Sequence, residues 1–206
     1  MKIKKILKNL IVVSMLGSLI FSMSACKGET DVPNGIKDQY INEKYYIQTG
    51  VPENWTMQAD VNKDYLDTTT GLLFNIYPDT SADSRSPQFS VFHKKNTMIQ
   101  LTLNGSMDLV KAEFDKSGRE GLTQSAPENI FKRKMQYKYV KYDFQKNGET
   151  WKGEYYVIII NNGYLILDYE GSAVATDGST SPFDKYYSEF SKIMEDFRIL
   201  GFEEEA

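Results

Sequence analysis

The chain has very few of the residues that most often carry out chemistry. Its 206 residues include one histidine, His93, and one cysteine, Cys26. A single histidine excludes a zinc site built from several histidines, and a single cysteine excludes an internal disulfide and a Cys-x-x-Cys redox motif. Glycine-rich phosphate loops of the G-x-x-x-x-G-K-[ST] and G-x-G-x-x-G types are also absent from the sequence. Several familiar classes of metal, redox and nucleotide enzymes are therefore excluded.

A long apolar segment is absent as well. The most apolar stretch, residues 11–21, is shorter than the ~20 residues of a membrane-spanning helix and is interrupted by Ser14, Gly17 and Ser18. Four lysines precede it within the first eight residues, and small residues follow it. This order of a basic start, a short apolar run and small residues predicts a secretory signal peptide over residues 1–25.

Cys26 directly follows this signal. The tetrapeptide Met23-Ser24-Ala25-Cys26 resembles the lipobox of bacterial lipoproteins, although Met23 stands where that family usually has leucine. The resemblance implies that Cys26 takes a diacylglyceryl group and becomes the first residue of the mature chain. Two acyl chains, at ~0.8 kcal/mol per buried CH₂, would anchor the domain at the extracytoplasmic face of a bacterial membrane. A secreted protein whose cysteine is incidental is the alternative.

The mature chain is acidic and contains no block of basic residues. The predicted signal holds four of the 24 Lys and Arg and none of the 28 Asp and Glu, so residues 26–206 carry 20 positive against 28 negative charges, a net charge of −8. Nucleic-acid binding depends on Lys and Arg that neutralise phosphate, so it is excluded as a function. An acidic domain should not adhere to anionic lipid by its charge, which makes the acyl anchor more necessary.

One domain of ordinary size is expected after a tether. Residues 26–44 are polar and predict a flexible tether, in which only Tyr40 and Ile41 could dock on the domain. The domain is expected over residues 45–202, and an acidic tail follows over residues 203–206.

The second half of the domain predicts an antiparallel meander. Asn147-Gly148 and Asn162-Gly163 separate apolar segments, and Asn-Gly is the strongest short signal for a hairpin turn. The continuous apolar run 157–160 indicates a central strand covered on both faces. The strands expected over the whole domain are residues 45–47, 56–61, 72–77, 88–94, 99–105, 130–135, 137–145, 150–160 and 164–170.

Two helices are expected to pack on this sheet. The first begins with Ser106 as N-cap and ends near residue 118. The second begins after the cap Ser181 with Pro182 in its first position, and its apolar residues recur at helical spacing to Phe197. Strands, a helix, a meander and a long final helix predict an α+β fold with an antiparallel sheet.

The segment Val51-Pro52-Glu53-Asn54-Trp55 opens a pattern that continues with residues 88–91, 153–157 and 164–167 and with the aromatic helix that ends at Phe197. This pattern resembles the PsbP-like domains, which include bacterial lipoproteins related to the extrinsic subunit of the photosynthetic oxygen-evolving complex. The resemblance implies an α-β-α sandwich and an accessory or binding role without catalysis. It brings no catalytic residues to this chain.

Four carboxylates on adjacent predicted strands are the candidates for catalysis: Glu149, Glu154, Asp168 and Glu170. A pair of carboxylates can hydrolyse a glycosidic bond when their separation suits the reaction. Whether any two of them pair depends on the strand register, which remains open at this point. A solvated position on the sheet is the alternative for each.

Four aromatic residues are the candidates for partner binding: Trp151, Tyr155, Tyr164 and Tyr169. They flank one predicted hairpin and could stack on a sugar, a peptide or a loop of a membrane protein. Cross-strand aromatic pairs also stabilise sheets by ~0.2–1 kcal/mol without binding anything, and this structural role is the favoured alternative.

Two weaker motifs favour structural roles. His93 could formally join a Ser-His-Asp triad, but no G-x-S-x-G motif accompanies it, and a strand histidine with a satisfied ring nitrogen is favoured. Residues 60–64 have the D-x-N-x-D spacing of a calcium loop, but Tyr65 and Gly71 stand where an EF-hand needs Gly and Glu. A polar turn is the favoured interpretation of that segment.

These observations predict a membrane-anchored, non-enzymatic lipoprotein without a cofactor or metal, whose domain binds a protein partner or an envelope component. A cell-surface hydrolase that acts on glycan through strand carboxylates is the alternative. A solute-binding component of a transporter is a third hypothesis, which is disfavoured because one domain lacks the two lobes of most such receptors.

Overall fold

The computed structural model describes residues 35–59, 71–79, 85–95, 102–117, 119–160, 163–175 and 178–200. All of them belong to one compact unit, Asn34–Ala206. The predicted signal peptide, Cys26, the motif at residues 60–64 and the acidic tail lie outside the described residues.

A small antiparallel sheet begins the fold. Its strands are β1 (Ile36–Asn42), β2 (Ile47–Pro52) and β11 (Arg198–Ile199), with β2 in the centre. The expected tether over residues 26–44 is therefore wrong in its last part, because β1 pairs with β2 along its length and the folded domain begins at Ile36 rather than Tyr45.

The main sheet has eight strands, all paired antiparallel. Their order is β3-β4-β5-β10-β9-β8-β6, and β7 also pairs with β8. The strands are β3 (Trp55–Ala59), β4 (Leu72–Pro78), β5 (Gln88–Lys95), β6 (Glu120–Gln124), β7 (Glu128–Lys132), β8 (Met135–Lys146), β9 (Glu149–Ile160) and β10 (Gly163–Ser172).

The meander was predicted correctly, with one shift. Asn147 and Gly148 have φ of 55° and 78°, as a two-residue hairpin turn between β8 and β9 requires. Between β9 and β10 the expected Asn162-Gly163 turn is wrong by one residue, because Gly163 already pairs with Ile160 in the sheet.

The helices differ from expectation at their ends. Helix α2 (Leu103–Lys116) starts three residues before the expected cap Ser106: Thr102 is the N-cap, and its Oγ1 accepts a hydrogen bond from the Gly105 N–H at 3.0 Å. Ser181 caps the second helix as predicted. That helix is interrupted at Tyr186, which divides it into α3 (Pro182–Lys185) and α4 (Tyr187–Asp196).

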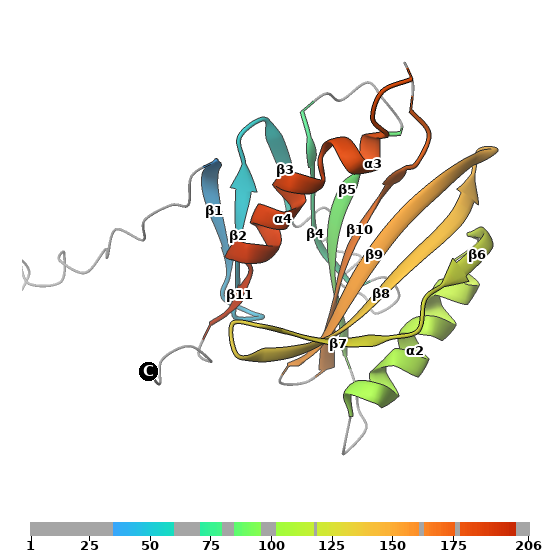
Figure 1. Ribbon diagram of the computed structural model, residues 1–206. Coiled ribbons are helices and arrows are strands. Elements are labelled where there is room, and N and C mark those ends of the chain that lie inside the picture. The colour runs from blue at the N-terminus through green and yellow to red at the C-terminus, as the bar shows by residue number, and fades with distance from the viewer. Residues whose placement is uncertain are drawn as a thin grey trace, which may run out of the picture. The chain divides into compact units, whose positions relative to one another are not determined.

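Helices cover both faces of the main sheet (Figure 1). On one face α2 contributes Val110 and Phe114 to a core with Tyr155 and Val157 of β9. On the other, Phe190 of α4 packs with residues of β5, β9 and β10. The central strand β9 is thus buried on both faces, as its apolar run predicted. The fold is an α+β sandwich built on an antiparallel sheet. None of the helices in the described part of the chain is long and apolar enough to cross a membrane.

Candidate functional site

The four candidate aromatics do not form a binding surface. Trp151, Tyr155, Tyr164 and Tyr169 are at most 4% exposed. The first three lie in the core under α2, whereas Tyr169 lies in the core under α4, stacked on Phe190. The partner-binding hypothesis for these residues is wrong because helices cover both faces of the sheet and all four aromatic side chains are buried in the two cores beneath them.

The strand register divides the four candidate carboxylates among three places. Asp168 and Glu170, two residues apart on β10, share the sheet face that α2 covers. Glu154 of β9 lies opposite Tyr169 and so points to the α4 face. Glu149 lies at the start of β9, where its Oε1 is 3.4 Å from Nη1 of Arg85. Only Asp168 and Glu170 are therefore brought together.

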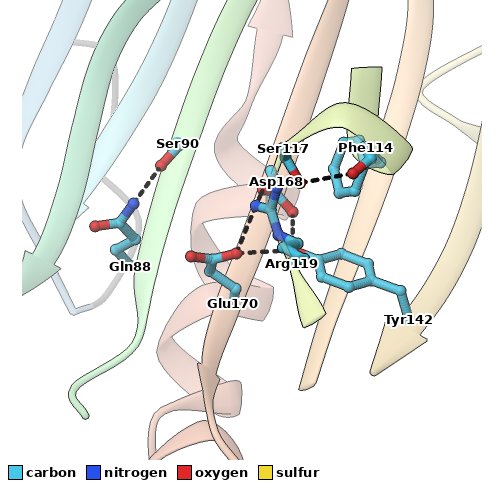
Figure 2. Close-up of polar contacts among 8 residues, drawn as sticks. All are labelled: Gln88, Ser90, Phe114, Ser117, Arg119, Tyr142, Asp168 and Glu170. Atoms are coloured by element: carbon cyan, nitrogen blue, oxygen red, sulfur yellow. Dashed lines mark hydrogen bonds and ion pairs between the residues drawn. The ribbon is translucent and has the colours of Figure 1, made fainter. Parts of the chain in front are cut away.

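Asp168 and Glu170 form a buried cluster with two residues that the sequence analysis did not single out (Figure 2). Arg119, which follows α2, reaches Glu170 Oε2 at 2.7 Å and Asp168 Oδ2 at 3.6 Å through its Nη2. The Tyr142 hydroxyl of β8 lies 2.6 Å from Asp168 Oδ1 and 3.2 Å from Glu170 Oε2. We call these four residues the Arg119 cluster.

A glycine on the intervening strand makes the Arg119 cluster possible. Tyr142 lies on β8 and the two carboxylates on β10, so the tyrosine must cross β9 to reach them. Gly153 is the β9 residue paired with both Tyr142 and Glu170. A Cβ atom at this glycine would overlap the Tyr142 ring, so only glycine leaves the path open.

The Arg119 cluster holds two acids against one cation. Burial opposes the charge of Arg119, but the acidic side chains around it, Glu170 first, raise the pKa of its guanidinium, so it stays charged. Burial, and then repulsion from Glu170, raises the pKa of Asp168 to about 7. Burial and the two carboxylates also raise the pKa of Tyr142, which keeps its hydroxyl protonated as a donor. The cluster therefore retains a proton near neutral pH.

Aromatic rings also lie close to the Arg119 guanidinium. Its central carbon lies 4.6 Å from the Phe114 ring centre and 5.3 Å from that of Phe144, distances at which a ring face attracts a cation. On β5, Gln88 and Ser90 pair with Glu170 and Asp168 and hydrogen-bond each other at 3.1 Å (Figure 2).

A second buried carboxylate, Glu154, is held by three tyrosines among the described residues. Its oxygens accept hydrogen bonds from Tyr139 and Tyr156 at 2.8 Å and from Tyr187 at 3.1 Å. Burial and the Glu154 charge raise the pKa of Tyr156, so the donors stay protonated. Three hydroxyl donors stabilise the charge in place of an ion pair.

The buried carboxylates are arranged to connect strands. Asp168 is 3% exposed, and one of its oxygens is bound by Tyr142, so a substrate has no direct approach to it. In the described ranges, no three Asp, Glu, His or Cys side chains gather into a group that could hold a metal. His93 lies in β5 against the Tyr45 ring, at 4.5 Å, and its Nε2 finds no hydrogen-bond partner among the described residues. The expected hydrogen bond is therefore not seen at Nε2.

The solved structures that match this chain include two proteins with this architecture. The cyanobacterial PsbP (CyanoP) of Synechocystis sp. PCC 6803 aligns over 82% of this chain and 95% of its own, with 13% identity and a TM-score of 0.51. LpqN of Mycobacterium tuberculosis, involved in cell envelope biogenesis, aligns over 75% of this chain and 83% of its own, with 14% identity and a TM-score of 0.53. No protein-family model and no curated protein matches the sequence. At such identities the likeness establishes the fold alone: the chain has the PsbP-like α+β architecture that its sequence pattern predicted.

Proposed function

We propose that this protein is a membrane-anchored, non-enzymatic lipoprotein whose domain binds a protein partner or an envelope component at the extracytoplasmic face of a bacterial membrane. The observation that carries the proposal is the order of the first 26 residues: a lysine-rich start, a short apolar run and Met23-Ser24-Ala25-Cys26. A diacylated Cys26 would supply two acyl chains, which is what stable anchoring takes.

Two further observations support a binding role. LpqN, which shares the fold, is involved in cell envelope biogenesis, so this architecture occurs in an envelope protein. The buried carboxylates Glu154, Asp168 and Glu170 are engaged with tyrosine or arginine side chains and connect neighbouring elements. Both observations favour a domain that presents a surface over one that encloses a reaction.

The anchor is tested by replacing the acylated atom. Cys26→Ser should move the exported protein from the membrane fraction to the soluble fraction, whereas Ser22→Ala, which leaves Cys26 in place, should not. Mass spectrometry of the exported wild-type protein should show a diacylglyceryl group on Cys26. An unmodified thiol, or a Cys26→Ser protein that stays in the membrane fraction, would contradict the anchor.

The binding role is tested by affinity capture from detergent-solubilised membranes. A partner that is an integral or anchored component of the envelope should be enriched with the wild-type protein and reduced with the Cys26→Ser form, because anchoring confines both to one surface. Equal recovery with both forms would place the partner away from the membrane.

A glycan hydrolase is the second candidate and is disfavoured. Asp168 and Glu170 meet, and burial raises the pKa of Asp168 to about 7, as a general acid requires, but Asp168 is buried and bound by Tyr142, so a substrate would reach it only after the Arg119 cluster opens. If this candidate is right, glycan cleavage by the purified protein should be lost in Glu170→Gln and kept in Glu149→Gln. Absence of cleavage by the wild-type protein on cell-wall glycan would remove the hydrolase from consideration.

A further inference from the structure

Three large apolar side chains of the described residues stand out by their exposure. Phe131 is 71% exposed, Tyr46 is 64% exposed and Ile41 is 53% exposed. Phe131 lies on β7 next to the β7–β8 turn, and the other two flank the β1–β2 turn. Single exposed apolar side chains are common on protein surfaces, whereas several at one place can mark an interaction site.

The two turns lie beside the same short segment of chain, residues 195–200. At the β7–β8 turn, Arg133 donates two hydrogen bonds to the main-chain oxygen of Glu195, from Nε at 2.9 Å and from Nη2 at 2.6 Å. At the β1–β2 turn, the Leu200 N–H donates to the main-chain oxygen of Tyr46 at 2.6 Å. Both turns are thus fixed to the end of α4 and to β11, and their exposed side chains belong to one end of the molecule.

The β7–β8 hairpin is strongly basic. Residues 129–142 contain no acidic residue, and their five cations are Lys132, Arg133, Lys134, Lys138 and Lys141. Lys134 is exposed and has no ion-pair partner among the described side chains. Lys138 shares the face of the hairpin with Phe131, because it pairs with Asn129, two residues before Phe131.

The charges around the hairpin do not cancel this excess. Glu43 and Lys44 offset each other in the β1–β2 turn, and beside the end of α4 Lys192 offsets Glu195 and Arg198 offsets Asp196. We name Ile41, Tyr46, Phe131, Arg133 and Lys134 together the turn surface. It combines exposed apolar side chains with a local positive charge on a chain whose net charge is negative.

We propose that the turn surface contacts the headgroups of an anionic lipid bilayer. The proposal rests on the proposed anchor, which keeps the domain beside the membrane. An aromatic ring with a polar or basic neighbour suits the membrane–water boundary, and each Lys or Arg near an anionic leaflet strengthens binding about fivefold. Electrostatic attraction is screened within about 8 Å at physiological salt, so the bilayer interacts with the local charge of the turn surface and not with the net charge of the chain.

The chain between anchor and domain is short enough to keep the turn surface near the lipid and long enough to let it touch. Nine residue steps separate Cys26 from Gly35, and at ~3.5 Å per step they span at most about 32 Å. The β1 strand leads from Gly35 to Ile41 over about 20 Å. The maximum span of the chain from Cys26 to Gly35 therefore exceeds the distance from Gly35 to Ile41 along β1. The domain can thus turn so that the turn surface meets the bilayer that holds Cys26.

The test is hydrogen exchange of the full-length lipid-bearing protein in nanodiscs of phosphatidylcholine alone or of phosphatidylcholine mixed with phosphatidylglycerol. Co-elution with phosphatidylcholine discs reports the anchor, and the difference in exchange between the two discs reports the turn surface. The amides of the two turns, residues 42–47 and 131–136, should exchange about fivefold more slowly in the anionic discs, and added salt should reduce the effect.

Variants assign the effect to the turn surface. Lys134→Glu and Phe131→Ser should each remove the slowing, and Lys116→Glu and Leu109→Ser, the same changes on exposed positions of α2, should keep it. Equal exchange in both discs by an anchored protein would overturn the proposal while leaving the anchor intact.

The acidic tail is the competing occupant. If Glu203, Glu204 and Glu205 cover the basic hairpin, their joint replacement by glutamine should speed exchange at residues 131–136 in phosphatidylcholine discs. That result, together with no difference between the discs for the wild-type protein, would assign the turn surface to the tail and overturn its assignment to lipid.

Discussion

At the scale of single residues, the Arg119 cluster decides how the β10 end of the sheet responds to pH. Asp168 and Glu170 share one guanidinium, so full ionisation would leave an extra negative charge in a place that water does not reach. A buried charge without its own partner is strongly destabilising. Retaining one proton on the pair removes that charge, and the raised pKa of Asp168 expresses the same preference.

This preference predicts that stability falls as pH rises. In the unfolded chain Asp168 titrates near its ordinary value of 3.8, whereas in the folded protein burial raises its pKa to about 7. Between these values only the folded state holds the proton, so increasing pH favours unfolding, by up to about 4 kcal/mol in total at 1.36 kcal/mol per pKa unit. Well below pH 3.8 both states are protonated, and Asp168 contributes no pH dependence. Urea unfolding of the wild type and Asp168→Asn from pH 4 to pH 8 should show this decline in the wild type only.

A second variant separates the causes of the shift. Glu170→Gln removes the repulsion that helps to raise the pKa of Asp168, so that pKa should be lower in the folded variant. The stability of Glu170→Gln should therefore decline at a lower pH than that of the wild type. If the wild type and Asp168→Asn lose stability in parallel over the whole range, the shared proton is absent and the cluster is a simple ion pair.

Half of this cluster was within reach of the sequence. Asn147-Gly148 predicts a two-residue hairpin turn, and such a turn fixes the register of the strands on both sides. Counting outward from it places Tyr142 opposite Gly153, as the structure shows, and a large ring opposite glycine indicates a side chain that crosses the strand. Arg119 could not be found in this way, because it follows a helix end and reaches the sheet through tertiary packing without a periodic pattern.

At the scale of elements, α2 shows how a cap is misplaced by sequence alone. Ser106 and Thr102 are both good N-cap residues, and the apolar residues after each are compatible with a helix. The structure buries Ser106, whose hydroxyl donates to the main-chain oxygen of Leu103 inside the first turn, and gives the cap to Thr102. The alternation of Ile99, Leu101 and Leu103 predicts a strand that reaches Gly105, which is why the sequence favours the later cap.

The two caps predict different losses of stability. Thr102→Ala removes the acceptor of the Gly105 N–H and should lower the free energy of unfolding by about 1 kcal/mol. Ser106→Ala keeps that cap, so its effect should be smaller. Thermal or urea unfolding of the two variants measures both, and a larger loss for Ser106→Ala would return the start of the helix to the residue that the sequence favoured.

The sequence of β1 predicts a tether because edge strands need few apolar residues. Of its seven positions only Ile36 is buried, and the others are half-buried or exposed, so its sequence resembles a linker. The pairing partner β2 is buried at all six positions. An edge strand can thus be recognised from the strand that it covers more readily than from its own composition.

At the scale of the whole molecule, the net charge gives no indication of the local charge of one hairpin. A net charge of −8 argued against contact with anionic lipid, but the β7–β8 hairpin concentrates five cations and one exposed ring over 14 residues, 129–142. The fold class, by contrast, is predictable from the sequence because turn signals and helical periodicity recur over many residues. The turn surface depends on only a few residues, so no such repeated pattern indicates it. Which aromatic side chains are buried depends on the helices that cover both faces of the sheet. The amino-acid composition carries no information about that arrangement.

The start of the domain is the feature of the whole molecule most open to a direct test. A chain that begins at Asn34 keeps β1, and one that begins at Tyr45 lacks it. Without β1, the buried residues of β2 are uncovered, and Tyr40 no longer packs edge-on against Phe74 at 5.1 Å. Loss of the buried side chain of Ile36 and of this ring contact should reduce the free energy of unfolding by at least about 3 kcal/mol. Both chains retain Trp55 and Trp151, whose fluorescence reports urea unfolding. The chain from Asn34 should have a midpoint close to that of the chain from Cys26, and the chain from Tyr45 should have a lower one. Equal midpoints for the two truncated chains would mean that β1 contributes nothing to the domain and that the tether extends to residue 44.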